Sequence, residues 1–505
     1  MAQARAADFN LSEFYMNYTR FLLGLGSHQD AKLDIPELSV EFDLEPLPHP
    51  PAPASPLPPT PEGFPPAPPA APRRHARVYE TEVLETSANQ GSSRDPLGGA
   101  FAAILGDGSV VTWGHDEAGG KSSALNDQLK NVQQIQASNC AFAAILGDGS
   151  VVTWGDKTAA GQSSALKDQL NNVQQIQATH FAFAAILGDG SVVTWGDARY
   201  GGDSAAVQDQ LKNAQQIQAS DRAFAAILSD GSVVTWGDTR YGGDSTAVKD
   251  QLKNVQQIQA TSVAFAAVLC HGSVVTWGNA DHGGGSTAVK DQLKNVQQIQ
   301  AARSAFAAIL GDGSVVTWGC ARYGGDSSAV QDQLTNVQQI QASDDAFAAI
   351  LGDGSVVAWG NADHGGDSSD VQDQLTNVQQ IQASDSAFAA ILGDGSVVTW
   401  GDAVHGGDSS DVQDQLTNVH QIQASRGAFA AILGDGCVVT WGYAVWGGDS
   451  AAVQDQLKNV QRIQASDGAF AAILGDVSVA TWGHDAFGGD SSAVQGSTEG
   501  CLNSR

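Results

Sequence analysis

Hydrophobic positions along this chain recur with a constant spacing of 41 residues. Ten tryptophans keep that spacing, and a variant of AFAAILGDGSVVTWG surrounds each of them: Trp113, Trp154, Trp195, Trp236, Trp277, Trp318, Trp359, Trp400, Trp441 and Trp482. Nine links that resemble GGDSSAVQDQLKNVQQIQAS join the copies. A fixed period of this length is the signature of a repeat architecture. The pattern therefore predicts ten copies of one unit, numbered here 1 to 10 by their tryptophans.

Each copy contains three runs with strand character. In repeat 6, residues 305–310 (AFAAIL) and 314–319 (SVVTWG) are apolar or β-branched, and Asp312-Gly313 lies between them. This dipeptide predicts a hairpin with a primed turn, which needs a positive φ. Residues 337–342 (VQQIQA) predict the first strand of the next unit. Because both faces of the hairpin are apolar, neighbouring units must cover each sheet on both sides.

The repeat also resembles a known family. The motif Gly-x-Val-Val-x-Trp-Gly, with Val-x-x-Ile-x-Ala before the hairpin, resembles the regulator-of-chromosome-condensation repeats over roughly residues 100–495. Ser343 and Ala346 stand where the family has Gly and His, Gly-Gly-Asp-Ser replaces Gly-Gln-Leu-Gly, and the repeat is shorter. The resemblance implies a β-propeller. We therefore expect an all-β, propeller-like array, in which ten units form one ring, a ring with spare units or an open β-solenoid.

Ahead of the array the composition changes. All sixteen prolines precede residue 97, and fourteen of them lie from Pro46 to Pro72, which predicts a disordered, extended tail. The expected segments are 1–45 with a short helix at 11–25, a proline-rich linker at 46–76, a connection at 77–99, the repeat array at 100–495 and a tail at 496–505. Because the first hairpin lacks a preceding VQQIQ run, residues 78–84 (VYETEVL) are the candidate for a closing strand.

The copies differ from one another mainly in two short segments. One segment precedes Ala-Phe-Ala, as in His180-Phe181, Asp221-Arg222, Arg303-Ser304, Asp344-Asp345 and Arg426-Gly427. The other follows Trp-Gly and carries a row of aromatic or imidazole side chains five residues after the tryptophan: Tyr200, Tyr241, His282, Tyr323, His364, His405, Trp446 and Phe487. The first two copies have Ala118 and Ala159 there.

Strand direction places both variable segments on one rim of the array and the Asp-Gly turns on the other. Loops held by a rigid scaffold are frequent binding sites, and aromatic side chains are frequent interface anchors. The row is therefore the candidate partner-binding site. The alternative is that each row residue only packs under its own loop.

Charge limits the classes of partner. The chain has 25 basic and 55 acidic side chains, and 7 and 13 of these lie in residues 1–99, which leaves 18 and 42 on the array, a net charge of −24. This field disfavours nucleic acid and anionic membranes and favours basic partners, a basic protein among them, or cations. The alternative is that the acidity only keeps a repetitive surface soluble. The five cysteines, Cys501 among them, are odd in number and show no paired spacing. This usage indicates a reducing compartment, the cytoplasm or the nucleus.

No sequence motif for catalysis or cofactor binding appears, and the row histidines, one repeat apart, do not have the spacing of metal ligands. One tryptophan per repeat at a strand end is best explained as core. The prediction is a non-catalytic interaction scaffold without cofactor. The family resemblance adds two alternatives, a guanine-nucleotide exchange factor for a small GTPase and the substrate-recognition part of a ubiquitin ligase.

Val477 stands where the other copies have glycine, so the hairpin turn of the last repeat is predicted to be strained. The oligomeric state stays open.

Overall fold

The computed structural model describes residues 99–157, 163–476 and 478–492. All of them belong to one compact unit, Arg73–Arg505. They form ten separate antiparallel sheets, and the prediction of an all-β array with three strand runs per copy is confirmed. The candidate helix, the proline-rich linker, the closing strand at 78–84, Val477 and Cys501 lie outside these residues. No helix in the described ranges is long and apolar enough to cross a membrane.

The first sheet has two described strands, β1 (Ala100–Ile104) and β2 (Val110–Gly114), and the other nine sheets have three each. The leading strands are β3 (Val132–Ala137), β6 (Val173–Ala178), β9 (Ala214–Ala219), β12 (Val255–Ala260), β15 (Val296–Ala301), β18 (Val337–Ala342), β21 (Val378–Ala383), β24 (Val419–Ala424) and β27 (Val460–Ala465). The middle strands are β4 (Ala141–Leu146), β7 (Ala182–Leu187), β10 (Ala223–Leu228), β13 (Ala264–Leu269), β16 (Ala305–Leu310), β19 (Ala346–Leu351), β22 (Ala387–Leu392), β25 (Ala428–Leu433) and β28 (Ala469–Leu474). The last strands are β5 (Val151–Gly155), β8 (Val192–Gly196), β11 (Val233–Gly237), β14 (Val274–Gly278), β17 (Val315–Gly319), β20 (Val356–Gly360), β23 (Val397–Gly401), β26 (Val438–Gly442) and β29 (Val479–Gly483).

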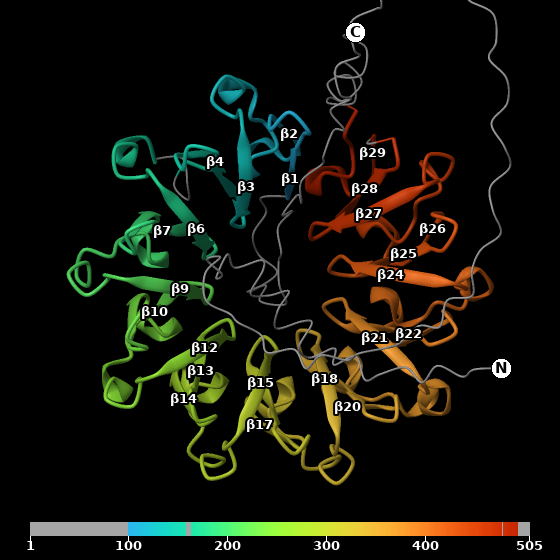
Figure 1. Ribbon diagram of the computed structural model, residues 1–505. Helices are drawn as coiled ribbons and strands as arrows, with labels where there is room; N and C mark the ends of the chain where they lie inside the picture. The colour runs from blue at the N-terminus through green and yellow to red at the C-terminus, as the bar shows by residue number, and fades with distance from the viewer. Residues whose placement is uncertain (1–98, 158–162, 477, 493–505) are drawn as a thin grey trace, which may run out of the picture. The chain divides into compact units, whose positions relative to one another are not determined.

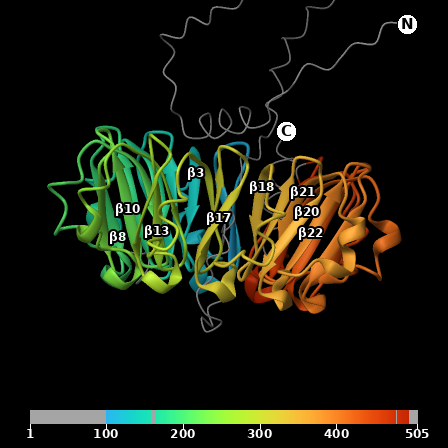
Figure 2. The same cartoon turned by 90° about the horizontal axis from the view of Figure 1, so that it is seen from below.

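Short helical turns follow the last strands. They are η1 (Asp116–Ala118), η4 (Ala198–Tyr200), η5 (Thr239–Tyr241), η7 (Ala280–His282), η8 (Ala321–Tyr323), η9 (Ala362–His364), η11 (Ala403–Gly407), η13 (Ala444–Trp446) and η14 (Asp485–Phe487). Further short turns in the links are η2 (Ser123–Leu125), η3 (Ser163–Leu166), η6 (Thr246–Val248), η10 (Ser369–Gln374) and η12 (Gln413–Gln415). Figure 2 shows several of these coils along one edge of the array.

The hairpin turn differs from the prediction. In repeat 6 the Gly313 amide donates to the Leu310 carbonyl and the Leu310 amide donates to the Ser314 carbonyl, at 2.9 Å each. Of the loop residues only Gly313 has a positive φ, 79°, so the connection is a three-residue loop with a bulge, and the primed turn was wrong. The residue before Asp312 needs no positive φ, which is why Ser229 and Cys270 replace glycine there in repeats 4 and 5.

Apolar side chains on both faces of the sheets form the core between repeats. In all ten repeats the phenylalanine of the middle strand is fully buried, and its ring stacks on the tryptophan of the last strand with centroids 5.2–5.3 Å apart. The indole also links neighbouring repeats: Trp236 Nε1 donates to the Gly201 carbonyl at 3.0 Å. The tryptophans are therefore core residues, as their spacing predicted.

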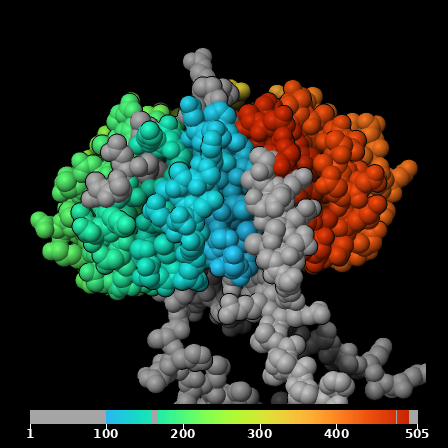
Figure 3. Space-filling model, turned by 90° about the horizontal axis from the view of Figure 1, so that it is seen from above, coloured from blue at the N-terminus to red at the C-terminus, as the bar shows by residue number. Residues whose placement is uncertain are grey.

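The ten repeats close into one ring. Trp113 Nε1 in repeat 1 donates to the Gly488 carbonyl in repeat 10 at 3.2 Å, the same bond that joins consecutive repeats. Ala469 and Ala471 share a core cluster with Phe101. Figure 1 shows the sheets following one another around the ring, and Figure 3 shows the blue first repeat beside the red last one. Among the described residues, the first and last sheets pack on each other and share no strand pairing. This closure by packing excludes the open solenoid.

Candidate functional rim

Both variable segments lie at the same end of the sheets, as the strand directions predicted. The Arg222 guanidinium, from the segment before β10, lies 4.6 Å from the ring centre of Tyr200 and 4.7 Å from that of Tyr241, which end η4 and η5. We call this end the variable rim, and the end that carries the hairpin loops the turn rim.

Repeat 4 shows how the scaffold fixes a row residue. The Asp238 carboxylate accepts a hydrogen bond from the Arg240 amide and starts η5. Gly242 follows the row residue with φ of 94°, and a Cβ there would lie 2.5 Å from the ring of Phe265 in the next repeat. Ser220 Oγ donates to the Tyr241 carbonyl at 2.8 Å. The backbone of Tyr241 is therefore held on both sides by residues that recur in other copies.

The row side chains are half-buried and touch the other variable segment. Phe181 packs edge-on against Tyr200, with ring centres 4.8 Å apart. Ser386 Oγ lies 3.1 Å from His364 Nδ1, and the His405 and Trp446 rings are 5.8 Å apart. Each row residue thus packs on the rim and also presents part of its surface to solvent. Their role in binding a partner remains a prediction.

Next to the row, backbone hydrogen bonds run from repeat to repeat. After eight leading strands, β3 to β24, the residue two positions further on donates its amide to the carbonyl of the equivalent residue in the next repeat, at 3.0–3.2 Å, and Asp467 after β27 accepts the last of these bonds. We call this set the annulus: Asn139, His180, Asp221, Ser262, Arg303, Asp344, Asp385, Arg426 and Asp467. In Figure 1 the leading strands converge on the inside of the ring, where repeats come closest. This bonding could not be predicted from the sequence, because it depends only on backbone atoms.

Three annulus carboxyls have raised pKa values. Burial raises the pKa of Asp221 to about 8, against the opposing pull of Arg303 and the Ser262 hydroxyl. Burial, reinforced by the neighbouring Asp385 carboxylate, raises the pKa of Asp344 well above its ordinary value. The pKa of Asp385 is also raised by burial, although Arg426 Nε donates to its carboxylate at 2.9 Å. Arg303 Nη1 lies 4.0 Å from Asp344 Oδ2, so Asp344 and Asp385 each have one arginine close to a buried carboxyl.

Two stretches of the variable rim, of four repeats each, differ in charge, and we call them the basic arc and the acidic arc. The basic arc, in repeats 3–6, has five arginines and four aspartates on the two variable segments: Arg199, Arg222, Arg240, Arg303, Arg322, Asp197, Asp221, Asp238 and Asp281. The acidic arc, in repeats 7–10, has one arginine and seven aspartates: Arg426, Asp344, Asp345, Asp363, Asp385, Asp402, Asp467 and Asp485. The formal charges are therefore +1 and −6.

Exposed apolar side chains occur in the acidic arc. Among the described residues, the exposed large hydrophobic side chains are Val404, Val445 and Tyr443, at 56%, 49% and 39% exposure. They flank His405 and Trp446 of the row. Sequence comparison of the copies identified this segment as variable, but not its exposure.

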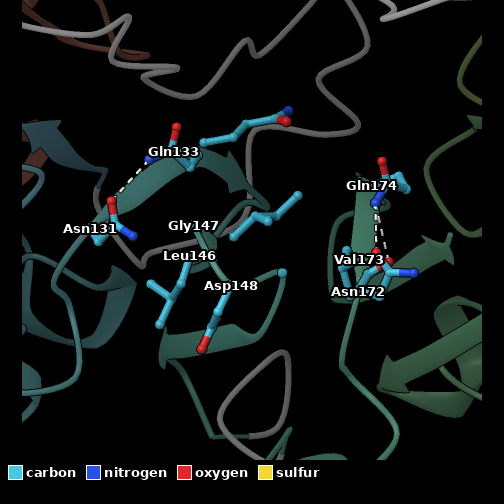
Figure 4. Close-up of a pocket in the computed structure, with 11 residues that line it drawn as sticks. Asn131, Gln133, Leu146, Gly147, Asp148, Asn172, Val173 and Gln174 are labelled. Carbon is cyan, nitrogen blue, oxygen red and sulfur yellow. Dashed lines mark hydrogen bonds between the residues drawn. The ribbon is translucent and has the colours of Figure 1, made fainter.

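The turn rim presents nearly the same side chains in each copy. Asp312 Oδ1 accepts from the Ser314 amide at 3.0 Å and from its hydroxyl at 2.6 Å, which explains the turn carboxylates by local geometry. Asn336 has a φ of 54°, and its carbonyl accepts from the Gly352 amide. A hollow of about 530 Å³ lies on this rim between repeats 2 and 3. Figure 4 shows residues that line it, Asn131 and Gln174 among them. Since its lining recurs in other repeats, it does not distinguish one repeat from another.

Within the described ranges, no three histidine, cysteine, aspartate or glutamate side chains lie close enough together to hold a metal ion. His364 Nδ1 faces the Asp345 carboxylate at 3.6 Å, and His405 Nδ1 lies 2.8 Å from Asp402. Two of the three row histidines, His364 and His405, are thus each engaged with a single carboxylate of the rim.

No protein-family model and no curated protein matches this chain. Among solved structures, it is similar to yeast RCC1 (Prp20) bound to Kap60, with a TM-score of 0.32 and 17% identity over 56% of this chain and 72% of that one. It is also similar to the computationally designed Ika8 protein, with a TM-score of 0.29 and 14% identity over 62% of this chain and 96% of that one. The CRINKLY WD40 ectodomain of the Arabidopsis thaliana receptor kinase ACR4 aligns with a TM-score of 0.29 and 16% identity over 52% and 90%. These TM-scores are too low to support a functional inference.

Proposed function

We propose that this protein is a non-catalytic interaction scaffold that binds a protein partner through its variable rim. The observation that carries the proposal is that ten copies of nearly one sequence differ mainly in two segments, and that both segments lie on one rim. There they form a continuous track, in which row side chains such as Tyr200 and Tyr241 alternate with residues such as Arg222.

The form of the rim supports multivalent binding. Its row side chains recur at regular intervals on a scaffold held by indole, turn and annulus bonds from repeat to repeat. Many contacts that are each weak act together when one rigid array presents them. The net charge of −24 on residues 100–505 favours a basic partner and predicts an association rate that falls as salt rises.

The test is capture of partner proteins from cell extract by the full chain. Replacing Tyr200, Tyr241, Tyr323 and Trp446 together with alanine removes four anchors while leaving the buried Phe–Trp stacks in place. Truncated anchors typically cost about 2 kcal/mol or more each, so we expect capture to be lost with an unchanged circular dichroism spectrum.

The matched control is Asp189→Asn, Asp230→Asn and Asp312→Asn on the turn rim. Asparagine keeps the side-chain oxygen that accepts from the serine amide and removes only the charge. If capture is lost in the control and kept in the row variant, the interface lies on the turn rim and the proposal is contradicted. The captured protein also decides between the alternatives: a small GTPase indicates exchange activity, and ligase subunits indicate substrate recognition.

A further inference from the structure

One segment of the variable rim combines an uncapped helical turn with an exposed aromatic ring. The residue two positions after each tryptophan starts the helical turn, and in repeats 3, 4, 5, 7, 8 and 10 its side chain accepts a backbone amide hydrogen bond. His115 in repeat 1, Cys320 in repeat 6 and Tyr443 in repeat 9 make no such bond. Of these three uncapped turns, that of repeat 9 exposes an aromatic ring at the cap position.

A second departure lies beside the first. Four residues after the tryptophan, repeats 3, 4 and 6 carry arginine and repeats 5 and 7 carry aspartate, but repeats 8 and 9 carry Val404 and Val445. Both valines are about half exposed. Apolar side chains in adjacent repeats form one patch because the row joins them: the Tyr443 ring lies 5.0 Å from Trp446, and Trp446 lies 5.8 Å from His405.

Acidic groups surround this patch. Asp363, Asp402 and Asp485 flank it on the same helical turns of repeats 7, 8 and 10. The one arginine of the arc, Arg426, is already engaged, because its Nε donates to Asp385 and its guanidinium lies 5.8 Å from the centre of the Trp446 ring. The arc therefore combines exposed apolar surface with negative charge that no arginine on the same turns offsets.

We propose that the acidic arc is the docking site for a protein segment that carries lysine or arginine next to an aliphatic or aromatic side chain. Val404, Tyr443, Val445 and Trp446 receive the apolar side chain, and Asp363 and Asp402 attract the cationic ones. The inference rests on the proposed interaction function and specifies where on the rim the contact lies and what the partner presents. Aromatic anchors with a charged surround are typical of interface hot spots.

Charge decides between this occupant and the others. A second copy of the chain brings a net charge of −30, so its approach to an arc of charge −6 is opposed. An acidic segment and nucleic acid meet the same repulsion. A neutral apolar segment matches the valines and the rings, but leaves the flanking aspartates without a counterpart.

The experiment is titration of the full chain with a short labelled peptide of alternating lysine and leucine, followed by fluorescence anisotropy. Two further peptides replace leucine with serine or lysine with glutamate. Binding should need both the apolar and the cationic side chains. The first peptide should therefore bind, and each of the other two should bind at least about tenfold more weakly. Raising the salt concentration should weaken binding of the first peptide.

The test variant exchanges the repeat 9 segment for that of repeat 3, with Tyr443→Asp, Val445→Arg and Trp446→Tyr. Repeat 3 folds with this segment, and Asp197 shows that it supplies the missing cap. We expect binding to weaken by about 30-fold, the loss typical of a removed anchor. The control variant, Asp394→Asn with Asp435→Asn, changes the turn rim of repeats 8 and 9 and should bind as the wild type does.

Unchanged binding in the exchange variant, or no binding of the lysine–leucine peptide to the wild type, overturns this inference. A third variant distinguishes failure of this inference from failure of the scaffold function. It changes Tyr200, Tyr241 and Tyr323 to alanine. If this variant loses peptide binding and the repeat 9 exchange variant keeps it, the rim binds the peptide but the acidic arc is not the site. If no rim variant affects binding, both proposals lose their support.

Discussion

The basic arc and the acidic arc are built on the same backbone and carry different chemistry. In repeat 4 the helical turn presents Arg240 and Tyr241 and is capped by Asp238, and in repeat 9 the same turn presents Val445 and Trp446 without a cap. Both turns end in a left-handed glycine that packs on a buried phenylalanine of the next repeat. Buried residues therefore hold the rim in place in both arcs, while its exposed positions accept arginine, aspartate, valine or tyrosine.

Replacing the glycine that follows the row residue should cause the largest loss of stability, and the loss should be equal in the two arcs. Gly242→Ala and Gly447→Ala each place a Cβ at 2.4–2.5 Å from a phenylalanine ring, at φ of 94° and 99°. Strain and overpacking each cost about 1–3 kcal/mol. Urea unfolding should show both variants destabilised by several kcal/mol. Ala444→Ser, at an exposed position, is the control and should change little. A large loss at Gly447 with none at Gly242 would mean that the arcs do not share one scaffold.

The raised pKa values of the annulus carboxyls predict that the stability of the protein depends on pH. Since the pKa of Asp221 is raised to about 8, the folded state favours its neutral form, and stability is lost as pH rises from the ordinary carboxyl value of 3.8 through about 8. Asp221→Asn should flatten this decline in thermal unfolding followed across that range. Asp344, in the acidic arc, has a pKa raised in the same direction, so Asp344→Asn should act likewise.

The control for the pH effect has the opposite sign. Hydrogen bonds from Ser314 lower the pKa of Asp312 on the turn rim, so its contribution to stability is present above 3.8 and lost as pH falls below it. Asp312→Asn should leave the decline toward pH 8 unchanged. Because the pKa of Asp385 is also raised, a decline that survives Asp221→Asn, Asp344→Asn and Asp385→Asn together would contradict the assignment to the annulus.

A smaller effect is expected from the cation held in the basic arc. Arg222 lies between two tyrosine rings, and each cation–π contact contributes about 0.5–1 kcal/mol. Arg222→Gln should therefore lower the unfolding free energy by about 1–2 kcal/mol. Arg322→Gln, which changes an exposed arginine on the turn of repeat 6, is the comparison. Equal losses for the two would show that the ring contacts contribute nothing.

The smallest expected effect is a gain in stability, at the uncapped turn of repeat 9. Tyr443→Asp restores the cap that Asp238 provides in repeat 4 and removes an exposed ring. Capping residues typically contribute about 0.5–1 kcal/mol or slightly more, so this variant should be more stable while binding the lysine–leucine peptide less well. Asp238→Ala should be less stable by a similar amount. A Tyr443→Asp variant that is less stable would show that the ring supports the fold.

The sequence predicted the repeat, the three strands of each copy, the core role of the tryptophans and the shared rim, because these follow from apolar periodicity and strand direction. It did not predict closure of the ring, which depends on the small rotation between repeats. It assigned a primed turn because Asp-Gly favours one, whereas the left-handed asparagine, such as Asn336, and the bulge at Gly313 set the actual loop. The annulus was missed because its bonds join backbone atoms of residues with unrelated side chains.

The central claim is that partners bind the variable rim and leave the turn rim free. The most direct measurement is carboxyl footprinting, in which exposed aspartates of the full chain are labelled with a carbodiimide and an amine, with and without saturating lysine–leucine peptide. Asp363 and Asp402 on the acidic arc should be protected, whereas Asp353 and Asp394 on the turn rim of the same two repeats should be labelled equally in both samples. Protection of Asp353 and Asp394 with unchanged labelling of Asp363 and Asp402 would contradict the account.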